Sequence, residues 1–345
     1  MKKIPLSMEL LRGVHHLEET EQGVMLQRMP SGVMKLYQAD PNRVLRAQCP
    51  AGVRITFYTD SATVKLPYTF GRESRQIYAF DAFVDDTPAE STSENGVFSM
   101  TLPGGKRKVE ILAPHLVECF FGDLEIDHQA ELTPAEPAEG KRLLFVGDSI
   151  MQGMTTTSPA KTYADQLTRA GKMDFYNLGI GGMTADPRWA ALIAGEYEYS
   201  QVIFSLGVND FVSGKSFADY RQDMTDFLSH FAGKPMVILS MTPFSSSPQT
   251  NAFGETADQF RACVRELAES RPDTLFIDGT SLLPDDPQFY VDGLHPNDAG
   301  AELFYRTVVK AGEMCYNIHK RSPVRNGGER ERLWTMKERF KHERQ

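Results

Sequence analysis

The stretch Leu143-Leu144-Phe145-Val146-Gly147-Asp148-Ser149 decides the fold of the second half of the chain. Its four consecutive apolar residues are typical of a strand that is buried on both faces. Four further short apolar runs follow, at residues 174–177, 202–206, 236–240 and 274–277. Amphipathic stretches of helical length alternate with these runs, at residues 163–170, 187–197, 217–231, 255–270 and 297–311. This alternation predicts a doubly wound α/β domain, with five parallel strands and helices on both faces of the sheet.

The sequence before this domain is rich in strand signals. Short apolar runs separated by Gly, Pro and Asp lie at residues 53–59, 62–66, 76–84, 96–102 and 108–112. In the first run Val53, Ile55 and Phe57 alternate with polar residues, as a half-buried strand requires. Residues 1–132 are therefore predicted to form an all-β sandwich or jelly roll.

The remaining segments set the predicted domain boundaries. Residues 133–140 contain two prolines and two glutamates, a composition that suits a linker. The α/β domain is expected to cover residues 141–316. The basic residues 317–345 are predicted to form a C-terminal tail or a short surface helix.

Composition narrows the class of protein. The 345 residues are 41% hydrophobic and 24% charged, so the chain can bury a sizeable core. The 37 Lys and Arg residues against 46 Asp and Glu residues give a net charge of -9, which repels a phosphate backbone. Nucleic acid is therefore not an expected partner. No apolar stretch approaches the roughly 18 residues of a membrane span, so no membrane partner is expected either.

The N-terminus and the cysteines indicate a reducing compartment. Met1-Lys2-Lys3 could open a signal peptide, but Glu9 and Arg12 interrupt the apolar run that would have to follow. The four cysteines are widely spaced and form no Cys-x-x-Cys pair: Cys49, Cys119, Cys263 and Cys315. We therefore expect a cytoplasmic protein with free thiols and without a thiolate zinc site.

Candidate catalytic residues follow four of the five predicted strands. In open α/β sheets the ligands bind outside the carboxyl ends of the strands. Ser149 follows the first strand as a candidate nucleophile or, with Asp148, as a helix cap. Gly182 lies in a glycine-rich turn after the second strand, and Asn209 follows the third, where its amide could support an oxyanion or an Asx turn. Asp292 precedes His295 by three residues, a spacing that allows the carboxylate to orient the imidazole.

Other motif classes are not supported. Thr184 occupies the last glycine position of a Gly-x-Gly-x-x-Gly dinucleotide fingerprint. The Gly-x-Ser-x-Gly elbow, the His-Glu-x-x-His motif and the Walker A loop are absent from the sequence. What remains is a nucleophile, a base, an orienting acid and oxyanion donors on one rim, which predicts a serine hydrolase.

These four blocks resemble the SGNH hydrolases, also called the GDSL esterase and lipase superfamily. The resemblance runs over roughly residues 140–312, through Gly147-Asp148-Ser149, Gly182, Gly207-Val208-Asn209-Asp210 and Asp292-Gly293-Leu294-His295. It implies a flavodoxin-like sheet, with Ser149 as nucleophile, His295 as base and Asp292 as its partner. It also implies an oxyanion hole built from the amides of Ser149 and Gly182 and the side chain of Asn209, and it implies no metal or organic cofactor.

Two points stay open beside this resemblance. Asp278, at the end of the fifth strand, is a rival partner for His295, although its greater separation from the histidine favours Asp292. Five large apolar residues near the motifs could line a pocket, but core packing is the expected role of most of them: Met151, Met154, Met183, Trp189 and Phe211.

The N-terminal region is similar to the β-sandwich domain that precedes the hydrolase domain in some relatives. These include carbohydrate esterase family 2 deacetylases and a bacterial branch that contains an acyltransferase. The resemblance implies a serine esterase that removes a short acyl group, such as acetyl, from a carbohydrate or a small molecule. An acyltransferase that uses the same acyl-enzyme, and a non-catalytic carbohydrate-binding protein, remain the alternatives. The oligomeric state is left open.

Overall fold

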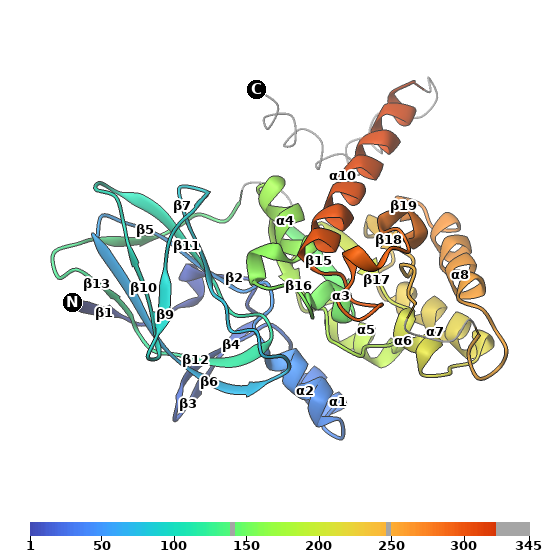
Figure 1. The fold of residues 1–345 in the computed structure, drawn as a ribbon, viewed down its shortest axis with the longest axis horizontal. Coiled ribbons are helices and arrows are strands. Elements are labelled where there is room, and N and C mark those ends of the chain that lie inside the picture. Colours follow the sequence, from blue (N-terminus) through green and yellow to red (C-terminus); the bar gives the residue numbers. More distant parts are fainter. Residues whose placement is uncertain (139–141, 246–249, 322–345) are drawn as a thin grey trace. The chain divides into compact units, whose positions relative to one another are not determined.

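A computed structural model describes residues 1–138, 142–245 and 250–321 of the chain (Figure 1). The chain divides into two compact units. The first unit is Met1–Pro137, together with the short segments Thr157–Ala160 and Asp174–Leu178. The second unit holds the remaining residues.

The first unit contains two antiparallel sheets, and both are drawn in the left half of Figure 1. The larger sheet has the order β1-β13-β6-β12-β4-β3, with β10 beside β6 and β9 beside β10; its strands are β1 (Lys2–Ile4), β3 (His16–Thr20), β4 (Gly23–Gln27), β6 (Thr63–Glu73), β9 (Thr92–Glu94), β10 (Val97–Thr101), β12 (Val117–Phe121) and β13 (Leu124–Ile126). The smaller sheet has the order β14-β5-β11-β7-β8, with β2 beside β5; its strands are β2 (Leu11–Arg12), β5 (Arg54–Thr59), β7 (Asp81–Val84), β8 (Thr87–Pro88), β11 (Arg107–Leu112) and β14 (Leu132–Pro134).

One hydrophobic core takes residues from both of these sheets. Ile55 and Phe57 come from the smaller sheet, and Phe98 and Phe121 come from the larger one. Ile55 and Phe57 are the apolar positions that alternate in the sequence, and both are buried; the polar Arg54 and Thr56 are buried as well, so the expectation of a half-buried strand was wrong for β5. An antiparallel β-rich N-terminal domain is thus confirmed, while a jelly-roll topology stays a prediction.

Several boundaries in this region differ from those predicted. Two helices, α1 (Ser31–Leu36) and α2 (Pro41–Gln48), interrupt the strands and were not predicted. Helix α2 does carry local signals, because Asp40 accepts a hydrogen bond from the amide of Arg43 and Pro41 stands in the first turn. The predicted linker at 133–140 begins inside a strand, since β14 (Leu132–Pro134) pairs with β5; residues 139 and 140 lie outside the described residues.

The second part of the chain builds the predicted parallel sheet. Its strand order is β16-β15-β17-β18-β19, which is the flavodoxin-like order 2-1-3-4-5. The strands are β15 (Arg142–Gly147), β16 (Asp174–Asn177), β17 (Gln201–Ser205), β18 (Met236–Leu239) and β19 (Thr274–Ile277). The registers of β15 with β17, of β17 with β18 and of β18 with β19 are all parallel. All five strands lie within two residues of their predicted positions. The apolar runs of the central strands β15, β17 and β18 are buried on both faces, whereas the edge strands β16 and β19 are only partly buried.

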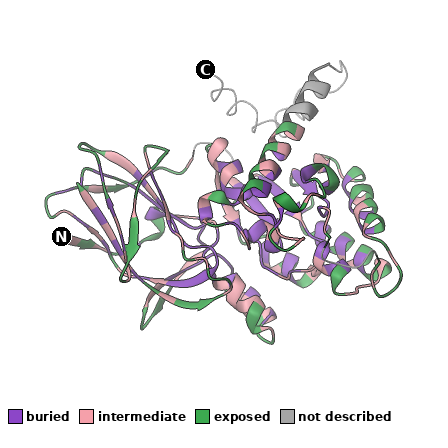
Figure 2. Cartoon of the chain, viewed as in Figure 1, coloured by how far each residue is buried: buried purple, intermediate pink, exposed green. Residues whose placement is uncertain are grey.

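Helices cover both faces of this sheet, with α4 against α10 and α7 against α5 and α8 (Figure 1). The exposed residues of these helices lie on their outward faces (Figure 2). The helices are α3 (Ser149–Gln152), α4 (Tyr163–Ala170), α5 (Pro187–Ile193), α6 (Val208–Val212), α7 (Phe217–Ser229), α8 (Ala257–Glu269), α9 (Gly279–Leu282) and α10 (Asp298–Arg321). Helix α10 continues past the predicted domain boundary at 316, so residues 317–321 of the predicted tail are helical. Residues 322–345 lie outside the described residues.

Two further observations concern the described residues alone. Cys49, Cys119 and Cys263 are free and buried, and burial raises the pKa of the Cys49 thiol to about 12. None of the helices described has both the length and the apolar character needed to cross a membrane.

Candidate active site

The four sequence blocks reach the same edge of the parallel sheet. Ser149 is the first residue of α3 and directly follows β15, while Asn209 lies on α6, just after β17. Gly182 lies in the loop between β16 and α5, and Asp292 and His295 lie in the loop before α10. Since carboxyl ends of parallel strands meet at one edge, the topology brings these segments together.

Ser149, His295 and Asp292 form a continuous chain of polar contacts. Nε2 of His295 lies 2.8 Å from Oγ of Ser149. Nδ1 of the same ring lies 2.8 Å from Oδ2 of Asp292. The side chain of His295 is 13% exposed and that of Asp292 is 45% exposed, so the contact chain runs from the buried serine toward solvent. This is the arrangement in which a base activates a hydroxyl nucleophile and a carboxylate orients the base.

The carboxylate of Asp292 is held by its own turn. Oδ1 accepts hydrogen bonds from the amides of Leu294 and His295, at 3.1 Å and 2.8 Å, while Oδ2 faces the imidazole. Burial by itself would raise the pKa of Asp292, but the hydrogen bonds and the charge of His295 outweigh it and lower that pKa. The carboxylate therefore stays ionised at neutral pH and can stabilise an imidazolium.

Contacts within the second unit fix the loop that carries His295. The amide of Val291 donates to the carbonyl of His295 at 2.9 Å, and Tyr290 and Pro296 form an antiparallel bridge. Oγ1 of Thr155 donates to the carbonyl of Pro296 at 2.8 Å. Because Thr155 follows α3, this bond connects the histidine loop to the segment that begins with the nucleophile.

Asp278, the rival candidate partner of His295, makes contacts elsewhere. It caps α9 by accepting a hydrogen bond from the amide of Thr280 at 3.0 Å, and it forms an ion pair with Arg265. Of the two candidate carboxylates, Asp292 is therefore the one that the structure places against His295.

The glycine-rich loop after β16 is a tight turn with defined anchors. The amide of Met183 donates to the carbonyl of Ile180 at 3.0 Å, so Gly182 is the third residue of the turn. Its φ of +80° is the left-handed value that this position of a type II turn requires, which explains the glycine. The amide of Gly181 donates to Oε1 of Gln152 at 2.9 Å, and the amide of Ile180 donates to the carbonyl of Gly147 at 3.1 Å.

Asn209 is attached to the same loop from the opposite side. One N–H of its carboxamide donates to the carbonyl of Met183 at 2.9 Å. Since a carboxamide has two N–H groups, the second can be offered to a ligand. Gly207, which caps the helix of Asn209, has a φ of +134°, and a Cβ there would lie 2.7 Å from the hydroxyl oxygen of Tyr220. The close approach of α7 thus requires glycine at this position.

Asp148, the residue before the nucleophile, is a buried acid. Its side chain is the N-cap of α3, where Oδ1 accepts a hydrogen bond from the amide of Ile150 at 3.0 Å. Burial raises the pKa of Asp148 to about 7, and the charge of Asp210 acts in the same direction. The predicted cap is thus confirmed, but nothing in the sequence signalled the perturbed acid.

Gln152 and Lys215 contact the loop that carries Gly182, and neither was predicted. Gln152 lies three residues after Ser149 on α3, a helical spacing that places both on one face and could have pointed to it. Lys215 follows α6 in a loop, where no periodicity marks it. The five apolar residues, most of which were expected in the core, are all buried, at 2% exposure or less, and Met154 also lines a pocket: Met151, Met154, Met183, Trp189 and Phe211. Within the described residues, no group of three His, Cys, Asp or Glu side chains could hold a metal ion.

Comparison with known proteins gives a family for this domain. Residues 145–303 match the model of the GDSL-like lipase/acylhydrolase family. A search of curated proteins finds no match.

Several solved structures share the fold of most of the chain. The salicylyl-acyltransferase SsfX3 from a tetracycline biosynthetic pathway is 21% identical, with a TM-score of 0.78 over 91% of this chain and 96% of that one. A protein from Bacteroides ovatus described as a GDSL-like lipase is 19% identical, with a TM-score of 0.71 over 90% and 96%. A family two carbohydrate esterase from Clostridium thermocellum is 15% identical, with a TM-score of 0.61 over 78% and 93%. At these identities the comparison establishes the fold.

Proposed function

We propose that this chain is a serine esterase that works through an acyl-enzyme on Ser149. Residues 145–303 form a GDSL-like lipase/acylhydrolase domain, which makes the chain a carboxylic ester hydrolase. The observation that carries the proposal is the pair of 2.8 Å contacts that link Ser149 to His295 and His295 to Asp292. They supply a nucleophile, a base and an orienting acid in one line.

Acylation follows from this order of groups. Nε2 of His295 accepts the proton of the Ser149 hydroxyl while Oγ attacks the ester carbonyl carbon. The tetrahedral intermediate collapses with loss of the alcohol, which receives the proton from His295. Water then attacks the acyl-enzyme while His295 accepts its proton, and His295 returns this proton to Oγ of Ser149 as the acid leaves. Asp292, kept ionised by its hydrogen bonds, stabilises the imidazolium in both steps.

The oxyanion of each tetrahedral intermediate needs donors near Ser149. We assign these to the amides of Ser149 and Gly182 and to the carboxamide of Asn209. The hydrogen bond from Asn209 to the loop of Gly182 supports this assignment, because it holds two of the three donors in one unit before substrate binds.

The substrate that we propose is a short acyl ester, such as an acetyl ester of a carbohydrate or small molecule. A pocket lined by Ile150, Met154, Thr155, Tyr163, Pro296 and Ala301 opens beside the residues that follow Ser149 and His295 in the chain. The family two carbohydrate esterase among the structural neighbours adds support for a sugar ester.

Acyl transfer to an alcohol is the second candidate. It uses the same acyl-enzyme and differs only in whether water or another hydroxyl accepts the acyl group. The similarity to SsfX3, named a salicylyl-acyltransferase, over 91% of this chain is the observation that favours it.

The experiment that tests the proposal is hydrolysis of p-nitrophenyl esters from acetate to octanoate by the full chain and by Ser149→Ala. We expect turnover that is highest for the shortest esters and that is lost in the variant. Serine-independent turnover would contradict the acyl-enzyme. An ester that reacts only when an alcohol acceptor is added would identify a transferase, and glycan binding without turnover in either protein would favour a binding protein.

A further inference from the structure

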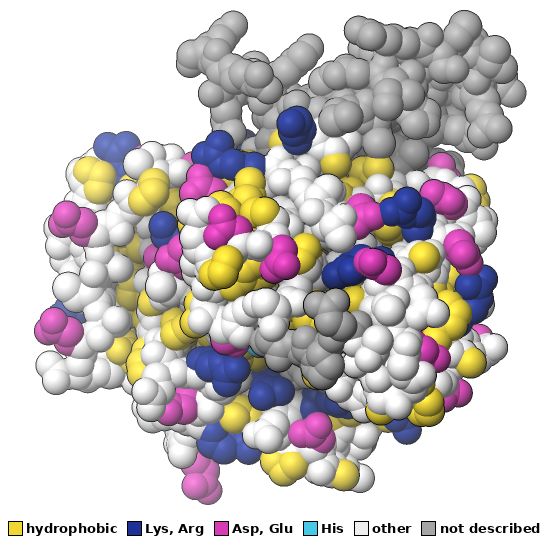
Figure 3. All heavy atoms as spheres, turned by 45° about the vertical axis from the view of Figure 1, so that its right-hand side comes forward, with side chains coloured by type: hydrophobic (Ala, Val, Ile, Leu, Met, Phe, Trp, Pro, Cys, Tyr) yellow, Lys and Arg dark blue, Asp and Glu magenta, His cyan; other side chains and the backbone are white. Residues whose placement is uncertain are grey.

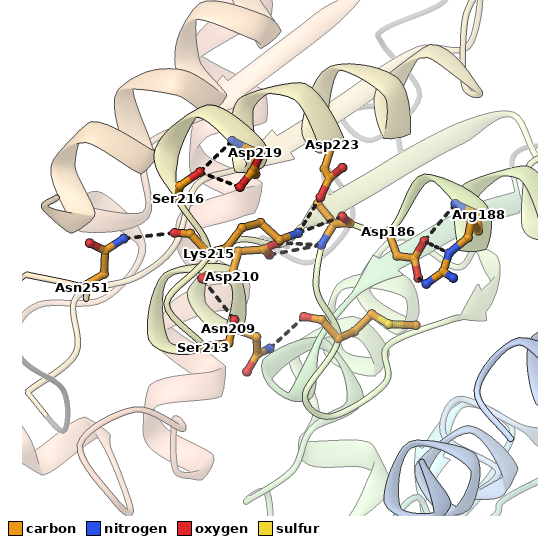
Figure 4. Close-up of polar contacts among 12 residues, drawn as sticks. Asp186, Arg188, Asn209, Asp210, Ser213, Lys215, Ser216, Asp219, Asp223 and Asn251 are labelled. Atoms are coloured by element: carbon orange, nitrogen blue, oxygen red, sulfur yellow. Dashed lines mark hydrogen bonds and ion pairs between the residues drawn. The ribbon is translucent and has the colours of Figure 1, made fainter. Parts of the chain in front are cut away.

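Asp210 and Lys215 form a buried ion pair directly beside the proposed oxyanion site (Figure 4). Asp210 follows Asn209 on α6 and its side chain is fully buried. Nζ of Lys215 lies 2.7 Å from Oδ1 of Asp210. Both carboxylate oxygens of Asp210 also accept from the amide of Ala185, at 3.2 Å and 3.1 Å.

Lys215 and Asp210 together bind both polar backbone groups of Ala185, in the loop that carries Gly182. Besides Asp210, the ammonium of Lys215 donates to the carbonyl of Ala185 at 3.3 Å and to Oδ2 of Asp223 on α7 at 2.8 Å. The three donors of the ammonium therefore have three acceptors. Ala185 is bound at its N–H by Asp210 and at its carbonyl by Lys215.

The backbone around Lys215 is also fixed. The amide of Lys215 donates to the carbonyl of Asp210 at 3.0 Å, and Nδ2 of Asn251 donates to the carbonyl of Lys215 at 3.1 Å (Figure 4). Both the backbone and the ammonium of Lys215 are therefore fixed by hydrogen bonds and ion pairs.

We propose that the Asp210–Lys215 ion pair is a positioning device that aligns the carboxamide of Asn209 for the oxyanion, an inference that rests on the proposed function. The pair fixes α6 against Ala185, two residues beyond Met183, the residue whose carbonyl Asn209 contacts. The carboxamide of Asn209 therefore binds the loop directly at Met183. The Asp210–Lys215 ion pair holds the helix of Asn209 to the same loop at Ala185.

Gly182 is held by a separate set of contacts. The first half of its loop is anchored by Gln152 and by the carbonyl of Gly147, which belong to α3 and β15. The Asp210–Lys215 ion pair holds the second half of this loop, from Met183 onward, to α6. The ion pair should therefore act through Asn209 and leave the amide of Gly182 in place.

Other ionisable groups face Asp210 from neighbouring elements. Asp148, which precedes α3, and Tyr220 of α7 interact with Asp210, whereas Asp223 of α7 pairs with Lys215. Burial raises the pKa of Asp210 and the charge of Lys215 opposes that rise. Removing Lys215 alone would leave a buried carboxylate beside a second acid, so a variant that also neutralises Asp210 is needed.

The test measures kcat and KM on a p-nitrophenyl ester for Lys215→Met and for the double variant Asp210→Asn with Lys215→Met. Each is made in the wild-type chain and in an Asn209→Ala background. We expect kcat to fall about tenfold to a hundredfold in both, with KM changed less than about twofold, because misalignment affects the transition state more than substrate binding. In the Asn209→Ala background the same changes should lower kcat less than about threefold, because the group they align is gone.

Arg221→Met is the matched control. It removes a cation from the exposed Arg221–Glu266 ion pair between α7 and α8, and kcat should not change. The double variant has no unpaired buried charge, so it gives a folded protein to measure if Lys215→Met alone does not fold.

Two results would overturn the inference while leaving the esterase intact. One is a serine-dependent kcat that stays within about twofold of wild type in the double variant. The other is an equal loss of kcat with and without Asn209, which would make the ion pair a purely structural feature. Turnover that survives Ser149→Ala would instead contradict the proposed function itself.

Discussion

At the scale of the residue, the hydroxyl of Ser149 and the imidazole of His295 lie within hydrogen-bond distance across 146 positions of the sequence. Each residue had a plausible local role when taken alone, as a helix cap or as a turn residue. Residue type and order were sufficient to single out Ser149, His295 and Asp292 as candidates, with Asp278 left as a rival for Asp292. Gln152 was missed although its helical spacing from Ser149 could have pointed to it, and the sequence could not select Lys215, because its role depends on contacts with a loop from another part of the chain.

Asn209→Ala should lower kcat on an ester about a hundred- to a thousandfold, with a smaller change in KM. Loss of one oxyanion donor typically has this effect, and a carboxamide that touches the transition state more than the substrate acts mainly on kcat. Steady-state kinetics together with the thermal unfolding midpoint test this. Val212→Ala, at an exposed position on the same helix, should keep full activity. A kcat within about threefold of wild type in Asn209→Ala would remove Asn209 from the site.

Asp148→Asn should stabilise the protein at pH 8 and leave its stability unchanged near pH 4. Because the folded pKa of Asp148 is about 7 and the ordinary value is 3.8, the fold favours the protonated acid. Its stabilising contribution is complete below about pH 4 and is lost as the pH rises through about 7. Three pKa units correspond to roughly 4 kcal/mol, which is the upper limit of the gain from a neutral amide.

Urea unfolding of Asp148→Asn and wild type between pH 4 and pH 8 measures this difference. The substitution retains the N-cap of α3, because the oxygen of the introduced carboxamide can still accept a hydrogen bond from the amide of Ile150. The comparison therefore isolates the loss of the titrating group. A difference in unfolding free energy that does not change with pH would show that Asp148 does not titrate in this range.

At the scale of the element, strands were predictable where burial set their pattern. The central strands β15, β17 and β18 of the parallel sheet were found because both of their faces are covered, so that most positions are apolar. Helices α1 and α2 were missed because they are short and lie among strands, where a few capping residues are weak signals beside many strand signals. Helix α10 ran past its predicted end because no glycine or proline stands between 313 and 321.

Helix α3 and the loop of Gly182 act together through Gln152. We expect Gln152→Leu to lower kcat about tenfold or more, because the amide of Gly181 loses its acceptor and the turn can rotate the amide of Gly182 away. Its effect should multiply with that of Asn209→Ala, since the two changes affect different donors. Gln166→Leu, the same change on α4, removes a solvent-exposed hydrogen bond to Lys161 and should leave kcat unchanged. Unchanged kcat in Gln152→Leu would show that the turn holds Gly182 without this bond.

At the scale of the whole molecule, the chain has two compact units and an acidic balance of charge. The face seen in Figure 3 carries basic and acidic side chains interspersed with one another. The core of the β-rich domain is formed entirely from residues of that domain, between Ile4 and Leu132.

Separate cores should respond separately to a cavity. Phe98→Ala, in the core of the β-rich domain, should lower the free energy of unfolding by about 3–5 kcal/mol. Hydrogen exchange should then increase in β6 and β10 while β17 and β18 keep their protection. Phe227→Ala, on α7 against Trp189 and Phe204, should show the opposite pattern. Equal loss of protection in both units from either change would show one cooperative structure.

The sequence by itself determined the class of fold and the order of the strands along the chain, and it singled out Ser149 and His295 as candidates, because hydrophobic periodicity and residue type are local properties. Only the tertiary structure decided that Asp292 and not Asp278 faces His295, that Asp148 is a buried acid, and that Lys215 and Asp210 hold Ala185. Each of these depends on distance and burial between segments far apart in the chain. Such quantities exist only once the strands have paired and the loops at their carboxyl ends have met.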